Sequence, residues 1–546
     1  MIADIKVTEK SFGSKVLMSG IKFSIDDSEK VGVIGRNGVG KSTLFGILTG
    51  NDLDFTGEII FKRGTVVVST AQEHHEMSDT TVLQYILAGL PEYSKLSHII
   101  ETYPNTMGEN MKLIHDYTQA LSRFSDKGFY QIEEQIEREL DNFQLPMIAH
   151  RQFNTLSGGE KRLVEVVKIM HSDADLALVD EPTNHMDYIA KNQYIDWMKT
   201  AREAMLVITH DRDVLNEVDR IVELKDGECV SYKGNYSAYL KQNAVSTGSK
   251  MNDFEMIEKR IVNLKQKVID YQRLKEKSRN PSTIQRFKRL EENSRKELAD
   301  LQNVDKPTFW IDKESAENLN YKVAAQYDKF KTRNIRMNLR GDESRSKHVL
   351  VSARDLSLGF KEPLFKGINI DLREGEALEL RGRNGAGKTT LIKALLGNKS
   401  GEIVQYDGEI SLDPHVRVGI YEQEISPKYF DLPLDTAIER MYLDRSLSIS
   451  NTKIRGLMSD YLFTESDIKT PIRLLSGGQK ARFQLIAMLS NNPQLLILDE
   501  PTNHLDLPSI EELETALKKY CGAILYVSHD GYFRSAMGGD VLQIGR

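Results

Sequence analysis

The chain has 546 residues, of which 40% are hydrophobic and 28% charged, and its net charge of -7 gives it no general attraction to nucleic acid or anionic membranes. Its two cysteines form no Cys-x-x-Cys pair, which excludes iron–sulfur and zinc clusters and indicates a reducing compartment. The first residues show no signal-peptide pattern and no apolar run approaches the roughly 20 residues of a membrane span, so we expect a cytoplasmic protein with two or more domains.

The first glycine-rich segment is Gly-Arg-Asn-Gly-Val-Gly-Lys-Ser at residues 35–42, between a predicted strand over 31–34 and a predicted helix over 42–48. Glycine lets the backbone N–H groups curl around phosphates, the Lys41 ammonium adds positive charge, and the Ser42 hydroxyl can bind Mg²⁺. The segment therefore predicts a phosphate-binding loop for ATP. Its residues are Gly35, Asn37, Gly38, Gly40, Lys41, Ser42 and Thr43.

Two further apolar runs of strand length end just before Asp180 and His210. In a mostly parallel sheet, which makes the fold class α/β, these strands deliver both residues to the same edge. We expect Asp180 to join the Mg²⁺ shell, Glu181 to orient or deprotonate the attacking water, and His210 to contact the γ-phosphate. Gln72 follows another strand-like run and can bridge metal, water and the helical part of the domain.

The second half of the chain repeats all of these motifs in the same register. Ser157, in a Leu-Ser-Gly-Gly motif that we call the signature, precedes Asp180 by 23 residues, and the second half has the same spacing. Glu181 precedes His210 by 29 residues, again as in the second half. Chance does not produce such agreement. The matching residues are Gly382, Asn384, Gly385, Gly387, Lys388, Thr389, Thr390, Gln423, Ser476, Gly477, Gly478, Asp499, Glu500 and His529.

Each signature opens a predicted helix, and a helix N-terminus favours an anion. Within one half, the signature is too far from the phosphate loop to reach the same nucleotide, so we expect it to serve the other half. Site one would combine Lys41 with Ser476, Gly477 and Gly478, and site two would combine Lys388 with Ser157, Gly158 and Gly159. We therefore expect a monomer whose halves clamp two ATP molecules head to tail, with hydrolysis at both sites.

The adenine rings need aromatic partners. Phe12 and Phe360 precede the lysines of the two loops by 29 and 28 residues. Each ring could stack on adenine or belong to the core, and the sequence leaves both readings open.

The motifs divide the chain into a first ATPase domain over residues 1–243, a linker over 244–346 and a second ATPase domain over 347–546. From the glutamine to the signature serine, the first domain spans 85 residues and the second 53. We place the extra residues within 92–135. They form either an arm that projects from the helical subdomain or a surface elaboration without a partner.

The linker carries a heptad seam of apolar residues from Phe254 to Tyr271. Pro281 stops this helix, and a second seam resumes at Ile284, so a helical hairpin would bury both. The predicted tip has a local charge of +6, which favours phosphate contact over a merely solvated coiled coil. A further basic helix over 320–340 would return the chain to the second domain. The basic residues of the tip are Arg273, Lys275, Lys277, Arg279, Arg286, Lys288 and Arg289.

Together these motifs resemble the ATP-binding cassette superfamily, and the resemblance covers both halves, which we call the first and second cassettes. Asp-Glu-Pro-Thr-Asn-His-Met-Asp, Asp-Glu-Pro-Thr-Asn-His-Leu-Asp, the basic linker and Lys233-Gly-Asn-Tyr236 are similar to its F subfamily of ribosome-associated translation factors. The resemblance implies two tandem P-loop cassettes with ATP and Mg²⁺, bound in the ribosomal tRNA exit site. It also implies that the linker tip meets rRNA and tRNA near the peptidyl-transferase centre, that the arm contacts the ribosomal stalk region, and that some members confer antibiotic resistance.

The chief alternative is the tandem-cassette ATPase of a membrane importer, which also lacks a membrane span. Such a protein needs permease partners and has no evident use for a basic hairpin. DNA-maintenance ATPases insert far longer coiled coils or carry zinc sites, and the ribosome-recycling relatives with iron–sulfur clusters need more than two cysteines. Whether this chain is a housekeeping translation factor or a drug-protection factor stays open at this stage.

Overall fold

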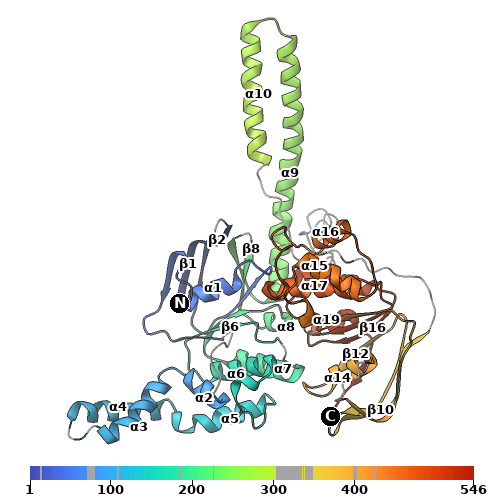
Figure 1. Ribbon diagram of the computed structural model, residues 1–546. Helices are drawn as coiled ribbons and strands as arrows, with labels where there is room; N and C mark the ends of the chain where they lie inside the picture. Colours follow the sequence, from blue (N-terminus) through green and yellow to red (C-terminus); the bar gives the residue numbers. More distant parts are fainter. Residues whose placement is uncertain are drawn as a thin grey trace. The chain divides into compact units, whose positions relative to one another are not determined.

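The computed structural model describes residues 1–12, 15–70, 80–106, 108, 110–184, 186–225, 227–302, 335, 337, 348–397, 403–422 and 425–545. Gln72, Gln423 and most of the predicted basic helix over 320–340 lie outside the described residues. The chain forms two compact units (Figure 1). One unit consists of Met1–Tyr236 with Ile335–Arg546 and contains both cassettes, and the other consists of Ser237–Asn334.

The first cassette combines a six-stranded sheet, in the order β5-β6-β7-β3-β8-β9, with a three-stranded antiparallel sheet, β2-β1-β4. All pairs in the larger sheet are parallel except β8–β9. Its strands are β1 (Ala3–Phe12), β2 (Lys15–Ile25), β3 (Lys30–Gly35), β4 (Thr56–Phe61), β5 (Val67–Ser69), β6 (Leu176–Asp180), β7 (Ala204–Ile208), β8 (Arg220–Lys225) and β9 (Glu228–Lys233). Its helices are α1 (Lys41–Leu48), α2 (Val82–Ala88), α3 (Tyr93–Thr106), α4 (Met111–Asp126), α5 (Ile132–Asn142), α6 (Gly158–Met170), α7 (Tyr188–Thr200) and α8 (Arg212–Leu215).

The second cassette repeats this plan with a five-stranded parallel sheet, β14-β15-β16-β12-β17, and an antiparallel sheet, β11-β10-β13. Its strands are β10 (Val349–Gly359), β11 (Pro363–Arg373), β12 (Ala377–Arg381), β13 (Val404–Leu412), β14 (Val418–Tyr421), β15 (Leu495–Asp499), β16 (Ala523–Val527) and β17 (Asp540–Gln543). Its helices are α14 (Lys388–Leu395), α15 (Leu434–Asp444), α16 (Asn451–Asp460), α17 (Gly477–Leu489), α18 (Leu507–Lys518) and α19 (Gly531–Met537).

The central strands explain why the motifs that contain Asp180 and Asp499 follow apolar runs. Every residue of β6, β7, β15 and β16 is buried, as expected for parallel strands that are covered on both faces. In register, Asp180 lies opposite Ile208, and Asp499 lies opposite Val527. The residue after each strand therefore reaches the same sheet edge, and the predicted α/β class with two tandem cassettes is confirmed.

The range in which we placed the extra residues of the first cassette is helical. Within it, α3 packs against α4 (Figure 1). Tyr93, Phe124 and Phe129 pack their rings together there, with centroids 5.2–5.7 Å apart. This aromatic cluster ties the start of α3 to the end of α4. The arm itself stays a prediction.

The smaller unit contains most of α9 (Tyr236–Lys277) and all of α10 (Pro281–Gln302) (Figure 1). Leu264 and Val268 of the predicted seam are buried, and the rings of Tyr271 and Phe287 stack between the helices at 6.3 Å. Lys275 donates a hydrogen bond to Glu291 at 2.7 Å, so its charge is neutralised within the hairpin. The other six basic residues of the predicted tip are exposed.

The buried carboxylate of Glu165 connects the signature helix α6 to α2. We expect the fold to become less stable when this carboxylate loses the cation that pairs with it. Glu165 is fully buried and accepts hydrogen bonds from the Tyr85 hydroxyl and, at 2.6 Å, from the Lys168 ammonium. The variant Lys168→Met should lower the free energy of unfolding by about 3–5 kcal/mol, because it leaves a buried charge without its cation. Urea unfolding measures the change.

The matched control is Lys127→Met, which removes an ion pair with the exposed Asp173. This surface pair should contribute no more than about 1 kcal/mol. Equal losses in the two variants would contradict the role assigned to the buried pair.

Candidate functional site

The two phosphate loops have the same local structure. β3 ends at Gly35 and α1 begins at Lys41, with Gly40 at φ 106° as the N-cap residue. This left-handed backbone conformation disfavours any residue with a Cβ, and a Cβ there would also lie 2.8 Å from the Met18 Cε. The Lys41 ammonium turns back into the loop and donates to the carbonyl oxygens of Gly35 at 2.6 Å and Arg36 at 3.2 Å. Burial lowers the pKa of this lysine.

The second loop shows the same contacts, since Lys388 donates to the carbonyl oxygens of Gly382 at 2.7 Å and Arg383 at 3.0 Å. Its N-cap residue, Gly387, has φ 99°. Each loop thus presents consecutive N–H groups and a lysine next to a helix N-terminus, which is the chemistry of a phosphate site.

A hydroxyl and a carboxylate meet beside each loop. Ser42 Oγ donates to Asp180 Oδ2 at 3.3 Å, and Thr389 Oγ1 donates to Asp499 Oδ2 at 3.2 Å. Oxygen ligands of this kind suit Mg²⁺, which keeps waters and phosphate oxygens in its shell. Among the described residues, no group of three or more His, Cys, Asp or Glu could hold a metal alone. The hydroxyl and the carboxylate beside each loop are oxygen donors of the kind that Mg²⁺ accepts.

The glutamates after β6 and β15 occupy an unusual backbone conformation. Glu181 has φ 46° and Glu500 has φ 51°, a region that L-residues rarely adopt and that clusters at functional sites. Their N–H groups donate to the carbonyl oxygens of Ile208 at 2.8 Å and Val527 at 3.0 Å. The neighbouring strands β7 and β16 thus hold each glutamate in place.

Each glutamate faces the histidine predicted for its site. Glu181 Oε1 lies 3.6 Å from His210 Nε2, and Glu500 Oε1 lies 3.2 Å from His529 Nε2. Burial, followed by the adjacent aspartate, raises the pKa of both glutamates to about 8. Burial, followed by the loop lysine, lowers the pKa of both histidines to about 3. Each pair thus offers a carboxyl suited to proton transfer near neutral pH, next to an uncharged imidazole.

Both signatures cap their helices with a complete capping box. Ser157 pairs with Glu160 at the start of α6, and Ser476 pairs with Gln479 at the start of α17. The residue that differs between the two signatures therefore performs the same local task in each.

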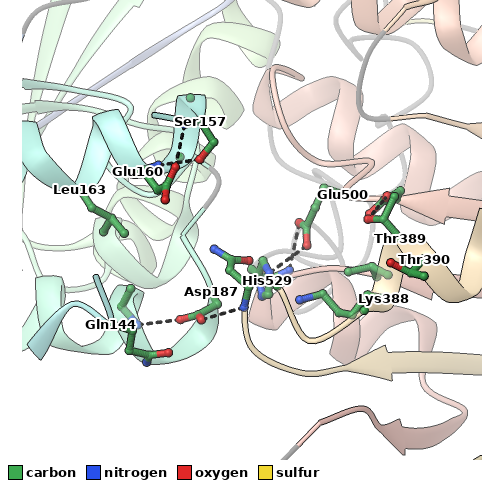
Figure 2. Close-up of a pocket in the computed structure, with 18 of the residues that line it drawn as sticks. Gln144, Ser157, Glu160, Leu163, Asp187, Lys388, Thr389, Thr390, Glu500 and His529 are labelled. Atoms are coloured by element: carbon green, nitrogen blue, oxygen red, sulfur yellow. Dashed lines mark hydrogen bonds and ion pairs between the residues drawn. The ribbon is translucent and has the colours of Figure 1, made fainter. Parts of the chain in front are cut away.

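A cavity of about 790 Å³ brings together most of the residues predicted for site two; Gly382 does not line it, and Gln423 lies outside the described residues. Figure 2 shows Ser157 and Glu160 of the first cassette on one side and Lys388, Thr389 and His529 of the second on the other. The remaining lining residues from the prediction are Gly158, Gly159, Phe360, Asn384, Gly385, Gly387, Thr390, Asp499 and Glu500. The first signature thus lies at the second phosphate loop.

The second signature meets the first phosphate loop in the same way. A Cβ on Gly478 would lie 2.1 Å from Asn37 Nδ2, so the two loops are in direct contact. Asn37 Nδ2 also donates to the carbonyl oxygen of His504 at 2.9 Å. The two cassettes therefore face each other head to tail.

The two aromatic residues have different surroundings. Phe360 and Leu364 both line the cavity of site two. Phe12 is exposed, and the Lys10 ammonium lies 4.8 Å from the centroid of its ring. Stacking on adenine remains a prediction for both rings.

The sequence analysis missed two aspartates that join the cassettes. Asp187 caps α7 with Oδ1 and accepts the Asn384 N–H with Oδ2 at 3.1 Å. Asp506 caps α18 with Oδ1 and accepts the Asn37 N–H with Oδ2 at 3.3 Å. The signal was present, because each aspartate lies two residues after the repeated Asp-Glu-Pro-Thr-Asn-His motif, seven residues after Asp180 and Asp499 respectively.

Comparison with known proteins identifies the family of the chain. The chain matches the family described as ABC transporter over residues 18–184 and 365–503, and a second family of the same description over 222–310. It is 30% identical over its whole length to the putative ATP-binding protein YdiF of Bacillus subtilis, covering 80% of that protein. It is 28% identical over 94% of its length to the ribosome protection protein VmlR of Bacillus subtilis (81% covered), and 27% identical over 98% to the Arabidopsis thaliana ABC transporter F family member 5 (74% covered).

The fold also matches a solved structure. An archaeal ribosome recycling factor, solved in complex with a ribosomal stalk protein, superposes with a TM-score of 0.58 over 98% of this chain and 87% of the other, at 17% identity.

The family model and the relatives show that the chain belongs to the ATP-binding cassette superfamily, in its F-type branch, and that it is an ATPase. Within the described part of the chain, no helix combines the length and apolarity needed to cross a membrane.

Proposed function

We propose that this ATPase is a translation factor that binds the ribosome at the tRNA exit site and brings its basic hairpin tip to the peptidyl tRNA and the peptidyl-transferase centre. The observation that carries the proposal is the tip, where six basic side chains are exposed on a chain of net charge -7. A dense phosphate backbone is the partner that recognises such a local charge. The relative named as a ribosome protection protein supports the same partner.

Two composite ATP sites would drive the binding cycle. In site one, Lys41 and the second signature hold the phosphates, and in site two Lys388 and the first signature do so. The serine or threonine hydroxyl and the aspartate described above would hold Mg²⁺, which neutralises charge on the phosphates. Glu181 and Glu500 then accept the proton of the attacking water. Closure on ATP and separation after hydrolysis would set the affinity for the ribosome.

Co-sedimentation with 70S ribosomes tests the role of the tip. A protein trapped with ATP by Glu181→Gln/Glu500→Gln should sediment with ribosomes, and the added change Arg273→Glu/Arg286→Glu/Arg289→Glu should weaken binding by about 100-fold or more at 150 mM salt, because three phosphate contacts become repulsive. The salt dependence of binding should also become less steep.

The matched control reverses three exposed lysines elsewhere on α9, Lys259, Lys265 and Lys267. It changes the net charge equally and should weaken binding less than the tip variant does. If both variants lost the same amount of ribosome affinity, binding would depend on the total charge of the protein and not on the tip. Association of the trapped protein with membranes instead of ribosomes would favour the importer alternative.

Drug susceptibility separates a housekeeping factor from a drug-protection factor. Cells with and without the gene are compared across antibiotics that act at the large-subunit active site. Selective loss of resistance to one drug class assigns protection, and unchanged susceptibility with slowed translation assigns a housekeeping role.

A further inference from the structure

A buried lysine links the histidine loops of the two cassettes. Lys191 lies on α7 of the first cassette and is 4% exposed. Its ammonium is 2.9 Å from Asp211 Oδ2 and 2.5 Å from Asp213 Oδ2, both in the loop and short helix after His210. It also donates a hydrogen bond to the backbone carbonyl of His529, in the second cassette, at 3.1 Å.

The charges fix this ammonium in place. Burial disfavours the charged form, but Asp211 and Asp213 outweigh that effect and hold the pKa of Lys191 above its usual value. A charged lysine with two carboxylates on one side has little freedom to leave its third partner. The position of the His529 backbone is therefore tied to the first cassette.

The contact around Lys191 is close. A Cβ on Gly531, two residues after His529, would lie 3.0 Å from Asp213 Oδ2. Arg212 pairs across the same boundary with Glu514 at 3.2 Å. Loss of the lysine would thus leave two carboxylates packed against the backbone of the second histidine loop.

The second cassette has no lysine at the position equivalent to Lys191. Ile510 stands four residues after Asp506, where Lys191 stands four residues after Asp187. An isoleucine has no donor for the carbonyl of His210. Tyr532 likewise replaces Asp213, and its hydroxyl accepts a hydrogen bond from Asn216 at 2.5 Å. The repeat is symmetric in its ATP-binding motifs and asymmetric here.

We propose that Lys191 is a positioning residue for site two: it holds the backbone of His529 from the first cassette, and site one has no equivalent device at Ile510. The inference rests on the proposed assignment of His529 to site two. Hydrolysis at site two then depends on a lysine anchored to the first cassette's histidine loop, and its loss should affect site two more than site one, because Lys191 bonds the His529 backbone directly but reaches the His210 loop through the side chains of Asp211 and Asp213.

ATPase assays with one site silenced test this asymmetry. In the Glu181→Gln background only site two turns over, and Lys191→Ile should lower kcat about tenfold or more, the effect of losing a hydrogen bond to a charged group. In the Glu500→Gln background only site one turns over, and the same change should lower kcat clearly less, because the His210 loop loses ion pairs of its neighbours Asp211 and Asp213 rather than a bond to its histidine backbone. A merely structural role would lower both equally, and that result would overturn the proposal.

Two further variants separate this positioning role from a general loss of stability. Lys191→Ile/Asp213→Tyr copies the residues of the second cassette and removes the lysine together with one of its two carboxylates; Asp211 stays, as its counterpart Asp530 does in the second cassette, and the selective loss should persist. Lys199→Ile changes an exposed lysine on the same helix and should leave both backgrounds unchanged. The single Glu→Gln variants are measured first, and if each does not remove part of the turnover, the two-site assignment fails and the inference fails with it.

Discussion

Glu181→Gln/Glu500→Gln should hydrolyse ATP about a thousandfold more slowly than the wild-type protein, because both general bases are lost. Each single variant should keep the turnover of the other site. The expectation follows from the matched geometry, in which both glutamates have left-handed backbones, adjacent histidines and pKa values raised to about 8. Glutamine preserves shape and volume, so ATP binding should survive.

Steady-state phosphate release, paired with a direct measurement of nucleotide binding, checks this result. Glu439→Gln, on the exposed face of α15, serves as the control and should change neither quantity. Full activity in one single variant and complete loss in the other would show that only one site hydrolyses.

Combining a phosphate-loop variant with a signature variant should show which signature serves which phosphate loop. Lys41→Ala and Ser476→Arg both lie in site one, so the double variant should lose hydrolysis at site one and keep it at site two. Lys41→Ala combined with Ser157→Arg should damage both sites and lower turnover about a hundredfold or more. An arginine at either serine removes the helix cap, places a cation at the positive end of the helix and fills the space for phosphate.

Phosphate release from the two double variants gives the answer, with Ser157→Thr as a control that keeps a hydroxyl cap. The reciprocal pairs with Lys388→Ala should show the opposite pattern. If the pair Lys41 and Ser157 instead kept its activity, each signature would serve its own cassette, contrary to the cavity that Ser157 and Lys388 share.

The order of motifs along the chain was sufficient to predict the α/β cassettes, the phosphate loops and the seams of the hairpin. These features depend on short-range chemistry, such as glycine at a tight turn, apolar runs in a buried parallel strand and heptad spacing in paired helices. The head-to-tail arrangement was also predictable, because a signature that cannot reach its own loop needs another partner.

Other contacts depended on tertiary packing, because their partners lie far apart in the sequence and no local pattern pairs them. Asp187 reads as a helix cap, yet its second oxygen binds the loop of the other cassette. From the sequence, Lys275 was predicted to be one more basic residue of the tip, but Glu291 neutralises its charge. The repeated motifs were enough to predict two phosphate loops, whereas the contact between Lys191 and the His529 carbonyl could be found only in the folded protein, because it requires two surfaces that are distant in the sequence to meet.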